Sequence, residues 1–320
     1  MIDPISKGID DLGNSLLQAL NNVQGFFGRE LSVATPVHES VLQLIGNTPL
    51  IKLNSIGSEF STYQFFLKAE FTNPTGSAKD RMALALLIDA EKKGKLKPGA
   101  KIYASGQMSS LVSISWVGKA RGYKVTCFVD KKTDEEGLKS LKIYGAKIEK
   151  ASSDPEIEAK LASDKDGAFY PDETENLAIP NFHFKTTGPE IWRDLKESVD
   201  AVVSAPGTGA ALTGIGRYLK SKNPEVKVIC ACPETHHLHP KNKKKIPSVF
   251  DPQVVDFFLT VTPESALHLQ SDLYEKEGIF VGRTTGFSLA GALAFAQESK
   301  DQKWEGGKFR NIVILSPDRS

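Results

Sequence analysis

A regular alternation of short β-rich runs with helical segments is the feature that most constrains this fold. Beyond residue 41, runs rich in branched and aromatic side chains alternate with segments of helical periodicity. The clearest runs are residues 65–70, 102–104, 124–129, 201–203, 226–231 and 312–315. Strands that alternate with helices form parallel sheets with helices on both faces. We therefore predict an α/β protein whose ligands bind beyond the carboxyl ends of the strands.

Size and charge narrow the classes of protein further. A chain of 320 residues can form one large domain or two. Its formal net charge of +1 gives no reason to expect nucleic acid or an anionic membrane as the main partner. The three cysteines form no CxxC pair, and no apolar run is long enough to span a membrane. Because the N-terminus also lacks the pattern of a secretory signal, we expect a cytoplasmic protein without a membrane span.

Apolar residues recur at three- and four-residue steps in residues 2–27, outside the alternating pattern. They are Ile5, Ile9, Leu12, Leu16, Leu20, Val23 and Phe27. This spacing predicts one amphipathic helix, and the polar residues 29–40 predict a linker. The apolar face can dock on the chain itself or on a dimer mate. Alternatively, it binds a protein partner or lies on a membrane surface.

A single lysine stands where a predicted strand, a turn and a predicted helix meet. The turn reads Asn-Pro-Thr-Gly-Ser-Ala and leads into Lys79-Asp80-Arg81 and the helical residues 82–90. Positive potential at the helix N-terminus, together with partial burial, favours a neutral amine at Lys79. A neutral lysine is what Schiff-base chemistry requires. The alternative is an ordinary exposed lysine in the first helical turn.

Three loops follow predicted strands and therefore lie where ligands are expected. Residues 105–110 form a strand-to-helix turn whose backbone amides can receive a carboxylate. Residues 206–214, Pro-Gly-Thr-Gly-Ala-Ala-Leu-Thr-Gly, form a glycine-rich turn that suits a phosphate. This turn lacks the Gly-Lys-Ser/Thr of a P-loop, and Leu212 replaces the last glycine of a dinucleotide fingerprint. The third loop, Gly-Arg-Thr-Thr-Gly at residues 282–286, precedes a predicted helix at 288–297.

Several blocks of sequence resemble the cysteine synthase and cystathionine β-synthase family, the fold type II enzymes that use pyridoxal phosphate. The blocks are residues 45–50, 73–81, 120–124, 185–192 and 207–214, and the resemblance covers about residues 41–318. It implies a tryptophan synthase β-like fold of two doubly wound α/β domains. The smaller domain would be residues 73–183, and the larger residues 41–72 and 184–320. The family is commonly homodimeric.

The resemblance also implies residue roles. Lys79 would form the Schiff base with the cofactor and then act as the general base at the substrate α-carbon. The hydroxyl of Thr284 would meet the pyridine nitrogen, which suits elimination and replacement at a β-carbon. The implied cofactor contacts are Lys79, Gln107, Gly207, Thr208, Gly209, Ala210, Ala211 and Thr284. The implied substrate contacts are Ser105, Gly106, Gln107, Met108 and Asp172.

The positions expected to face the substrate depart from the family pattern together. The usual Thr-Ser-Gly-Asn-Thr-Gly is here Ala-Ser-Gly-Gln-Met-Ser at residues 104–109, without either threonine. Asp172 or Glu173 replaces a glutamine that faces the substrate carboxylate, and would repel that group. A shortened basic segment at residues 236–245 replaces another glycine loop. Two interpretations remain: an enzyme with a different β-substituted substrate or nucleophile, or a non-catalytic relative that binds a partner.

A group of cysteines and histidines allows a metal site as an alternative to core packing. Cys230 and Cys232 alternate on a predicted strand and therefore share one of its faces. His236, His237 and His239 follow within a few residues. Thiols and imidazoles together can bind zinc, but the spacing matches no standard zinc pattern. We expect core packing and no metal.

Overall fold

The structure is a computed structural model that describes residues 37–242, 244–299 and 310–319. Residues Ser40–Ser320 belong to one compact unit. The predicted amphipathic helix at residues 2–27 and nearly all of the predicted linker lie outside the described residues. Within the described part of the chain, no helix is long and apolar enough to cross a membrane.

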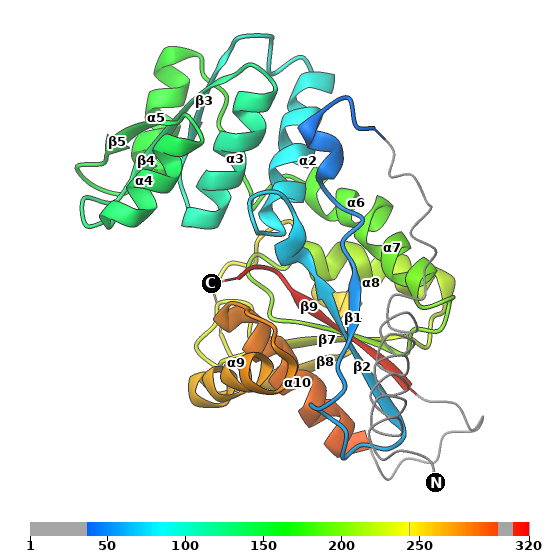
Figure 1. Ribbon diagram of the computed structural model, residues 1–320. Helices are drawn as coiled ribbons and strands as arrows, with labels where there is room; N and C mark the ends of the chain where they lie inside the picture. The colour runs from blue at the N-terminus through cyan, green and yellow to red at the C-terminus, as the bar shows by residue number, and fades with distance from the viewer. Residues whose placement is uncertain (1–36, 243, 300–309, 320) are drawn as a thin grey trace, which may run out of the picture. The chain divides into compact units, whose positions relative to one another are not determined.

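The larger of two sheets has six strands in the order β1-β2-β9-β6-β7-β8 (Figure 1). Its strands are β1 (Leu50–Lys52), β2 (Tyr63–Ala69), β6 (Ala201–Ser204), β7 (Lys227–Cys232), β8 (Phe257–Thr260) and β9 (Arg310–Ser316). Only β1 runs antiparallel to its neighbour, and the pairs from β2 to β8 are parallel. The carboxyl ends of β6, β7 and β9 therefore meet at one edge of this sheet.

Alternating side chains of the six-stranded sheet build two cores. Val203 and Ile314 pack with α9 (Pro263–Glu277) and α10 (Arg283–Ser299) on one face. Val202, one residue earlier, packs on the opposite face with α8 (Ala210–Lys222) and α7 (Thr187–Asp194). The α6 helix (Ala178–Lys185) packs against α8. The helices thus cover both faces, as the alternating sequence pattern predicts.

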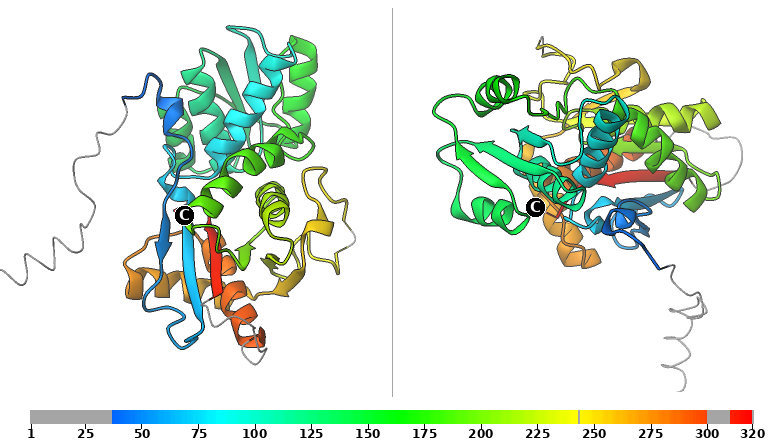
Figure 2. Two further views of the ribbon diagram at one scale, coloured as in Figure 1. Left: turned by 90° about the vertical axis from the view of Figure 1, so that its right-hand side faces the viewer. Right: turned by 90° about the horizontal axis from the view of Figure 1, so that it is seen from above.

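The smaller sheet has three parallel strands in the order β3-β4-β5. Its strands are β3 (Lys101–Ala104), β4 (Lys124–Val129) and β5 (Lys147–Lys150). Its helices are α2 (Lys79–Lys92), α3 (Met108–Ala120), α4 (Glu135–Ile143) and α5 (Pro155–Asp166). Leu86 of α2, Ile102 of β3 and Leu111 of α3 belong to a separate core, and α5 contacts β3 and β4. Figure 2 shows the helices beside this sheet. The described chain thus has two sheets, each packed with its own helices, while the predicted domain boundaries at residues 73 and 183 stay a prediction.

Three short 3₁₀ turns complete the described elements: η1 (Val41–Leu44), η2 (Glu70–Thr72) and η3 (Pro252–Val254).

The helix α10 begins earlier than the sequence indicates. Residues 282–286 are predicted as a loop, but α10 starts at Arg283, so Thr284 lies in its first turn. Gly286 is needed there for close packing, because a Cβ atom would lie 2.0 Å from the Ala266 carbonyl oxygen of α9. A glycine that allows two helices to touch resembles a turn glycine when only the sequence is known.

Candidate active site

A cavity of about 310 Å³ lies at the carboxyl ends of the large-sheet strands. Ser204 of β6, Cys232 of β7 and Leu315 of β9 contribute to its wall. Residues of the small-sheet layer, including Lys79 and Gln107, line it as well. The cavity therefore occupies the position at which parallel α/β sheets bind ligands, and it brings Lys79 together with the glycine-rich turn.

Hydrogen bonds of the preceding turn fix the position of Lys79. The Asp80 carboxylate accepts from the Thr75 backbone N–H at 2.8 Å and from the Thr75 hydroxyl at 2.6 Å. Gly76 adopts φ +84°, which a side chain would disfavour. The Ala78 N–H donates to the Pro317 carbonyl at 2.7 Å, and Ser77 forms an isolated antiparallel β-bridge with Asp318 through the backbone. The C-terminal strand end thereby holds the lysine turn from the opposite side.

The Lys79 amine is held by an ion pair inside this site. Its Nζ lies 2.8 Å from Glu173 Oε2, and the Ser110 hydroxyl donates to the same oxygen at 2.9 Å. The Lys79 and Glu173 side chains keep 22% and 17% of their exposure. Both groups are therefore partly desolvated; Lys79 lines the cavity, and Glu173 lies beside it through this ion pair.

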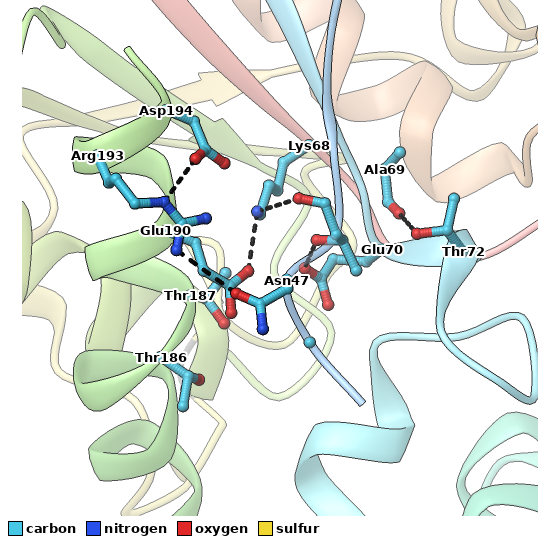
Figure 3. A network of polar contacts seen from close by, with 12 residues as sticks. Asn47, Lys68, Ala69, Glu70, Thr72, Thr186, Thr187, Glu190, Arg193 and Asp194 are labelled. Carbon is cyan, nitrogen blue, oxygen red and sulfur yellow. Dashed lines mark hydrogen bonds and ion pairs between the residues drawn. The ribbon is translucent and has the colours of Figure 1, made fainter. Parts of the chain in front are cut away.

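A buried network of charges fixes the strand and helix around Lys79. The Arg81 guanidinium bonds Glu70 at 2.7 and 2.9 Å and Glu190 at 2.7 and 2.8 Å. Lys68 bonds Glu190 at 2.9 Å and the Thr48 carbonyl at 2.6 Å (Figure 3). Burial alone would raise the pKa of Glu190, but Arg81 and then Lys68 lower it to about 2. These four charged side chains, Lys68, Glu70, Arg81 and Glu190, are called the buried charge network below.

The glycine-rich turn lies at the cavity, directly before the start of α8. Gly207 and Gly209 have φ of +49° and +84°, and α8 begins at the next residue, Ala210. No side chain of the described residues caps α8 at Gly209. A Cβ on Gly207 would meet nothing within 4 Å, whereas one on Gly209 would lie 2.3 Å from Phe250. Gly207, Thr208, Ala210 and Ala211 line the cavity, and Gly209 is backed by Phe250.

The predicted substrate loop contributes unevenly to the cavity. Gln107, which begins α3 as its N-cap, and Ser109 line it. Ser105 is buried, and its hydroxyl lies 2.9 Å from the Tyr170 hydroxyl. Met108 approaches α4 instead, since a Cβ on Gly137 would lie 2.7 Å from its Cε. Gly106 lies beside Glu173, since a Cβ on Gly106 would be 3.2 Å from Glu173 Oε1.

Of the two neighbouring carboxylates, the structure places Glu173 and not Asp172 next to Lys79. Asp172 Oδ1 accepts from the Thr174 N–H at 2.9 Å, the Thr174 hydroxyl at 2.7 Å and the Glu175 N–H at 3.1 Å. Asp172 therefore closes a turn, and neither Asp172 nor Glu173 is among the cavity residues; Glu173 reaches the site through its ion pair with Lys79. Its role as a substrate contact stays a prediction that this placement does not support.

Three ionisable residues line the cavity that sequence reasoning missed. Burial raises the pKa of Asp318, against the opposing charge of Lys79. Burial, aided by the charge of Arg81, lowers the pKa of His183 to about 4, and His183 Nδ1 lies 2.9 Å from the Thr187 hydroxyl. Glu70 reaches the cavity from the buried charge network. Asp318 follows the end of β9, where ligand contacts are expected, but no local pattern marks the other two.

The cysteines and histidines near β7 divide between the core and the cavity. Cys230 and Cys232 are both buried in the core on the α8 face, and Cys232 also reaches the cavity. His236 lines the cavity, and burial together with His237 and His239 lowers its pKa to about 4. His239 bonds the Thr260 hydroxyl instead. Within the described ranges, no three metal-binding side chains converge on one point.

Comparisons with known proteins agree with this geometry. A sequence profile described as pyridoxal-phosphate dependent enzyme matches residues 41–318. Cystathionine beta-synthase of Apis mellifera is 30% identical over 309 residues, covering 89% of this chain and 60% of that protein. Cysteine synthase of Staphylococcus aureus is 29% identical over 296 residues, covering 87% of this chain and 93% of that protein. The chain thus spans only three fifths of the first of these relatives.

Solved structures show the same likeness. O-ureido-L-serine synthase superposes with a TM-score of 0.79 at 29% identity, covering 89% of this chain and 92% of that one. A hydrogen sulfide-producing enzyme from Fusobacterium nucleatum gives a TM-score of 0.81 at 26% identity, covering 89% and 98%. The fold is therefore that of fold type II enzymes, as the sequence predicts. This chain belongs to the cysteine synthase-like family of enzymes that use pyridoxal phosphate.

Proposed function

We propose that this chain holds pyridoxal phosphate in the cavity and carries out β-elimination or β-replacement on an amino-acid-like substrate. The observation that carries the proposal is the placement of Lys79 in one cavity with the turn at Gly207–Ala211 and with Thr284. The nucleophile would be sulfide-like, as the names of the relatives suggest. A cytoplasmic location and a homodimer are parts of the same proposal.

The residues of the cavity fit the cofactor. A phosphate suits the start of α8, which has no side-chain cap and where a Cβ on Gly207 would meet nothing within 4 Å, because the N-terminus of a helix attracts anions. A volume of about 310 Å³ is within the range of small-ligand sites. Lys79 would hold the aldehyde end and Thr284 the ring nitrogen. When bound, the cofactor supplies an electron sink for the bond that breaks at the substrate α-carbon.

The chain's own residues supply position and proton transfer. The turn fixed by Asp80 and Pro317 holds Lys79 Nζ at the cavity, where it can take a proton from a substrate α-carbon. Thr284 offers a hydroxyl and no charge, so the ring nitrogen would gain no added positive charge from this side chain. Apolar residues such as Met82, Ile179 and Phe287 line the cavity and limit water.

The ion pair of Lys79 with Glu173 favours a second candidate function. A lysine bound by a carboxylate at 2.8 Å must leave it before reacting with an aldehyde. In this alternative the chain is a non-catalytic relative that acts by binding a partner, with residues 1–40 as the binding segment. The departures of residues 104–109 from the family pattern support this candidate as much as they support an enzyme with a different substrate.

One experiment separates the two functions. The protein is purified, mixed with pyridoxal phosphate and treated with borohydride, and cofactor fixed to the chain is measured by absorbance and mass. Enzyme function predicts fixation at Lys79 and, in a separate sample that has not been reduced, an absorbance change and product release with O-acetylserine, a related amino acid or its amide. Fixation without any response to such substrates favours the binding protein. Absence of fixation overturns the proposed function.

A second set of measurements addresses assembly. Light scattering of the full chain and of a variant without residues 1–40 reports the oligomeric state, and a monomer in both would contradict the homodimer. Capture experiments with the same two proteins test the partner segment. Partners retained after the deletion would exclude residues 1–40 as their binding site.

A further inference from the structure

We infer that Glu173 determines the substrate class of this site: it favours ligands with a neutral or cationic group beside Ser110 over ligands with a carboxylate there. Free α-amino acids would then bind poorly, and carboxylate-blocked amino acids such as amides would bind well. The inference rests on the proposed function in assuming that the cavity takes amino-acid-like ligands.

The Glu173 carboxylate occupies the gap between the lysine turn and the start of α3. One oxygen, Oε2, accepts from Lys79 Nζ at 2.8 Å and from the Ser110 hydroxyl at 2.9 Å. The other, Oε1, lies against Gly106, 3.2 Å from where a Cβ would stand. A negative group thus already occupies the start of α3, where helix amides would otherwise receive a ligand carboxylate.

The backbone around Glu173 holds the carboxylate in place. The turn that follows is closed by three hydrogen bonds to Asp172 Oδ1. The Val249 N–H donates to the Thr174 carbonyl at 3.2 Å and joins this turn to the segment before η3. Glu173 is therefore not on a free loop that an entering ligand would simply displace.

The charges around the cavity point in the same direction. Lys79 is the cation beside Glu173, and a cofactor that uses its Nζ would remove that partner. Glu70 and Asp318 line the cavity itself, whereas Glu173 lies beside it against Lys79, and Glu70 is already paired with Arg81. Two carboxylates within about 4 Å repel strongly in a partly desolvated site. A ligand with an amide at this position would instead donate a hydrogen bond to Glu173.

The test compares L-serine with L-serinamide, which differ only in this group. Each is titrated into cofactor-loaded protein, and binding is read from the change in cofactor absorbance, without turnover. The wild type should bind the amide at least about tenfold more tightly, a value we take from like-charge repulsion. Glu173→Gln should reduce that preference at least about tenfold, because the NH2 group of a neutral amide can donate a hydrogen bond to a ligand carboxylate.

Asp172→Asn is the matched control, since it removes the same charge one residue away and keeps the oxygen that closes the turn. It should retain the wild-type preference. Equal affinity of the wild type for both ligands, or an unchanged preference in Glu173→Gln, would overturn the inference. If the wild type takes no cofactor, the proposed function fails, and calorimetry of the cofactor-free protein with the same ligands decides the inference: no preference, or no binding, overturns it.

Discussion

Two lysines, Lys68 and Lys79, form ion pairs in very different surroundings. The Lys68 side chain is fully buried and bonds both Glu190 and the Thr48 carbonyl within a network closed by Arg81. The Lys79 side chain is 22% exposed and has one carboxylate partner at the edge of a cavity. The ion pair of Lys68 is thus saturated, with its hydrogen bonds made inside the protein, whereas the ion pair of Lys79 is open to exchange with a ligand.

The difference separates structural from functional charge. A buried pair whose hydrogen bonds are all made has nothing left to offer a ligand, and removing one partner leaves an uncompensated charge. A partly exposed amine beside a cavity can exchange its partner for a ligand, which is typical of functional sites. The buried charge network holds α2 against β2 and α7, and Lys79 uses the position that this creates.

The largest expected effect comes from breaking the open pair at its reactive end. Lys79→Ala should abolish borohydride fixation of the cofactor completely, since no other lysine lines the cavity among the described residues. Lys79→Arg should lose fixation equally while keeping a cation for Glu173. Mass spectrometry of the reduced protein measures both. Fixation retained by either variant would place the reactive amine elsewhere.

Breaking the saturated network should affect stability instead. Arg81→Leu leaves two buried carboxylates without their main partner and should lower the free energy of unfolding by about 3–5 kcal/mol. Arg121→Leu, which removes a half-exposed pair with Glu91, should cost about 1 kcal/mol or less. Urea denaturation measures both. Equal losses would show that the network adds no special stability.

The pH dependence sharpens the comparison through a buried neutral group. The unfolded chain protonates His183 below about pH 6.5, but in the folded protein its pKa is about 4. The unfolded state therefore binds more protons in this window, and this histidine alone should lower stability by about 2 kcal/mol from pH 7 to pH 5. The pKa of His236 is also lowered to about 4, but this side chain is only partly buried, so solvent screening makes its loss smaller.

Urea denaturation at several pH values tests this directly. His183→Gln should remove more than half of the slope contributed by these two histidines, whatever its stability at pH 7. Below about pH 4.5 the wild type should continue to lose stability, because the pKa of Glu190 is lowered to about 2 and its ion pairs are lost on protonation. An unchanged slope in His183→Gln would mean that the ring is not held neutral.

The smallest effect is expected at the second contact of Glu173. Ser110→Ala removes one hydrogen bond to a carboxylate that keeps its ion pair with Lys79, and should change stability by about 1 kcal/mol or less. The preference for serinamide should fall, but less than in Glu173→Gln. A larger loss in Ser110→Ala would indicate that the hydroxyl itself binds the ligand.

The sequence predicts the parts of the site that depend on local order. Strand ends, the turn before Lys79 and the glycine-rich turn at 206–214 follow from residue types whose backbone preferences are strong. The predicted start of α10 was wrong because Gly286 allows α10 to pack closely against Ala266 of α9, and the sequence alone does not show this contact. Asp318 and His183 depend in the same way on distant segments that fold against them.

The choice between Asp172 and Glu173 shows the same limit at one turn. Either carboxylate satisfies the sequence pattern, because the sequence does not show which of two adjacent side chains in a turn faces the site. The structure separates them because Asp172 closes the turn through Thr174 and Glu175, which leaves the next side chain to face Lys79.

The backbone pairing of Ser77 and Ala78 with Asp318 and Pro317 has a consequence for how the protein is made. On the ribosome, the lysine turn is synthesised long before the segment that secures it emerges. The nascent chain should therefore acquire the cavity only after β9 has been synthesised and has inserted between β2 and β6. Such a distant contact also slows folding, so vitamin B6 uptake should begin only after residues 310–318 have left the ribosome.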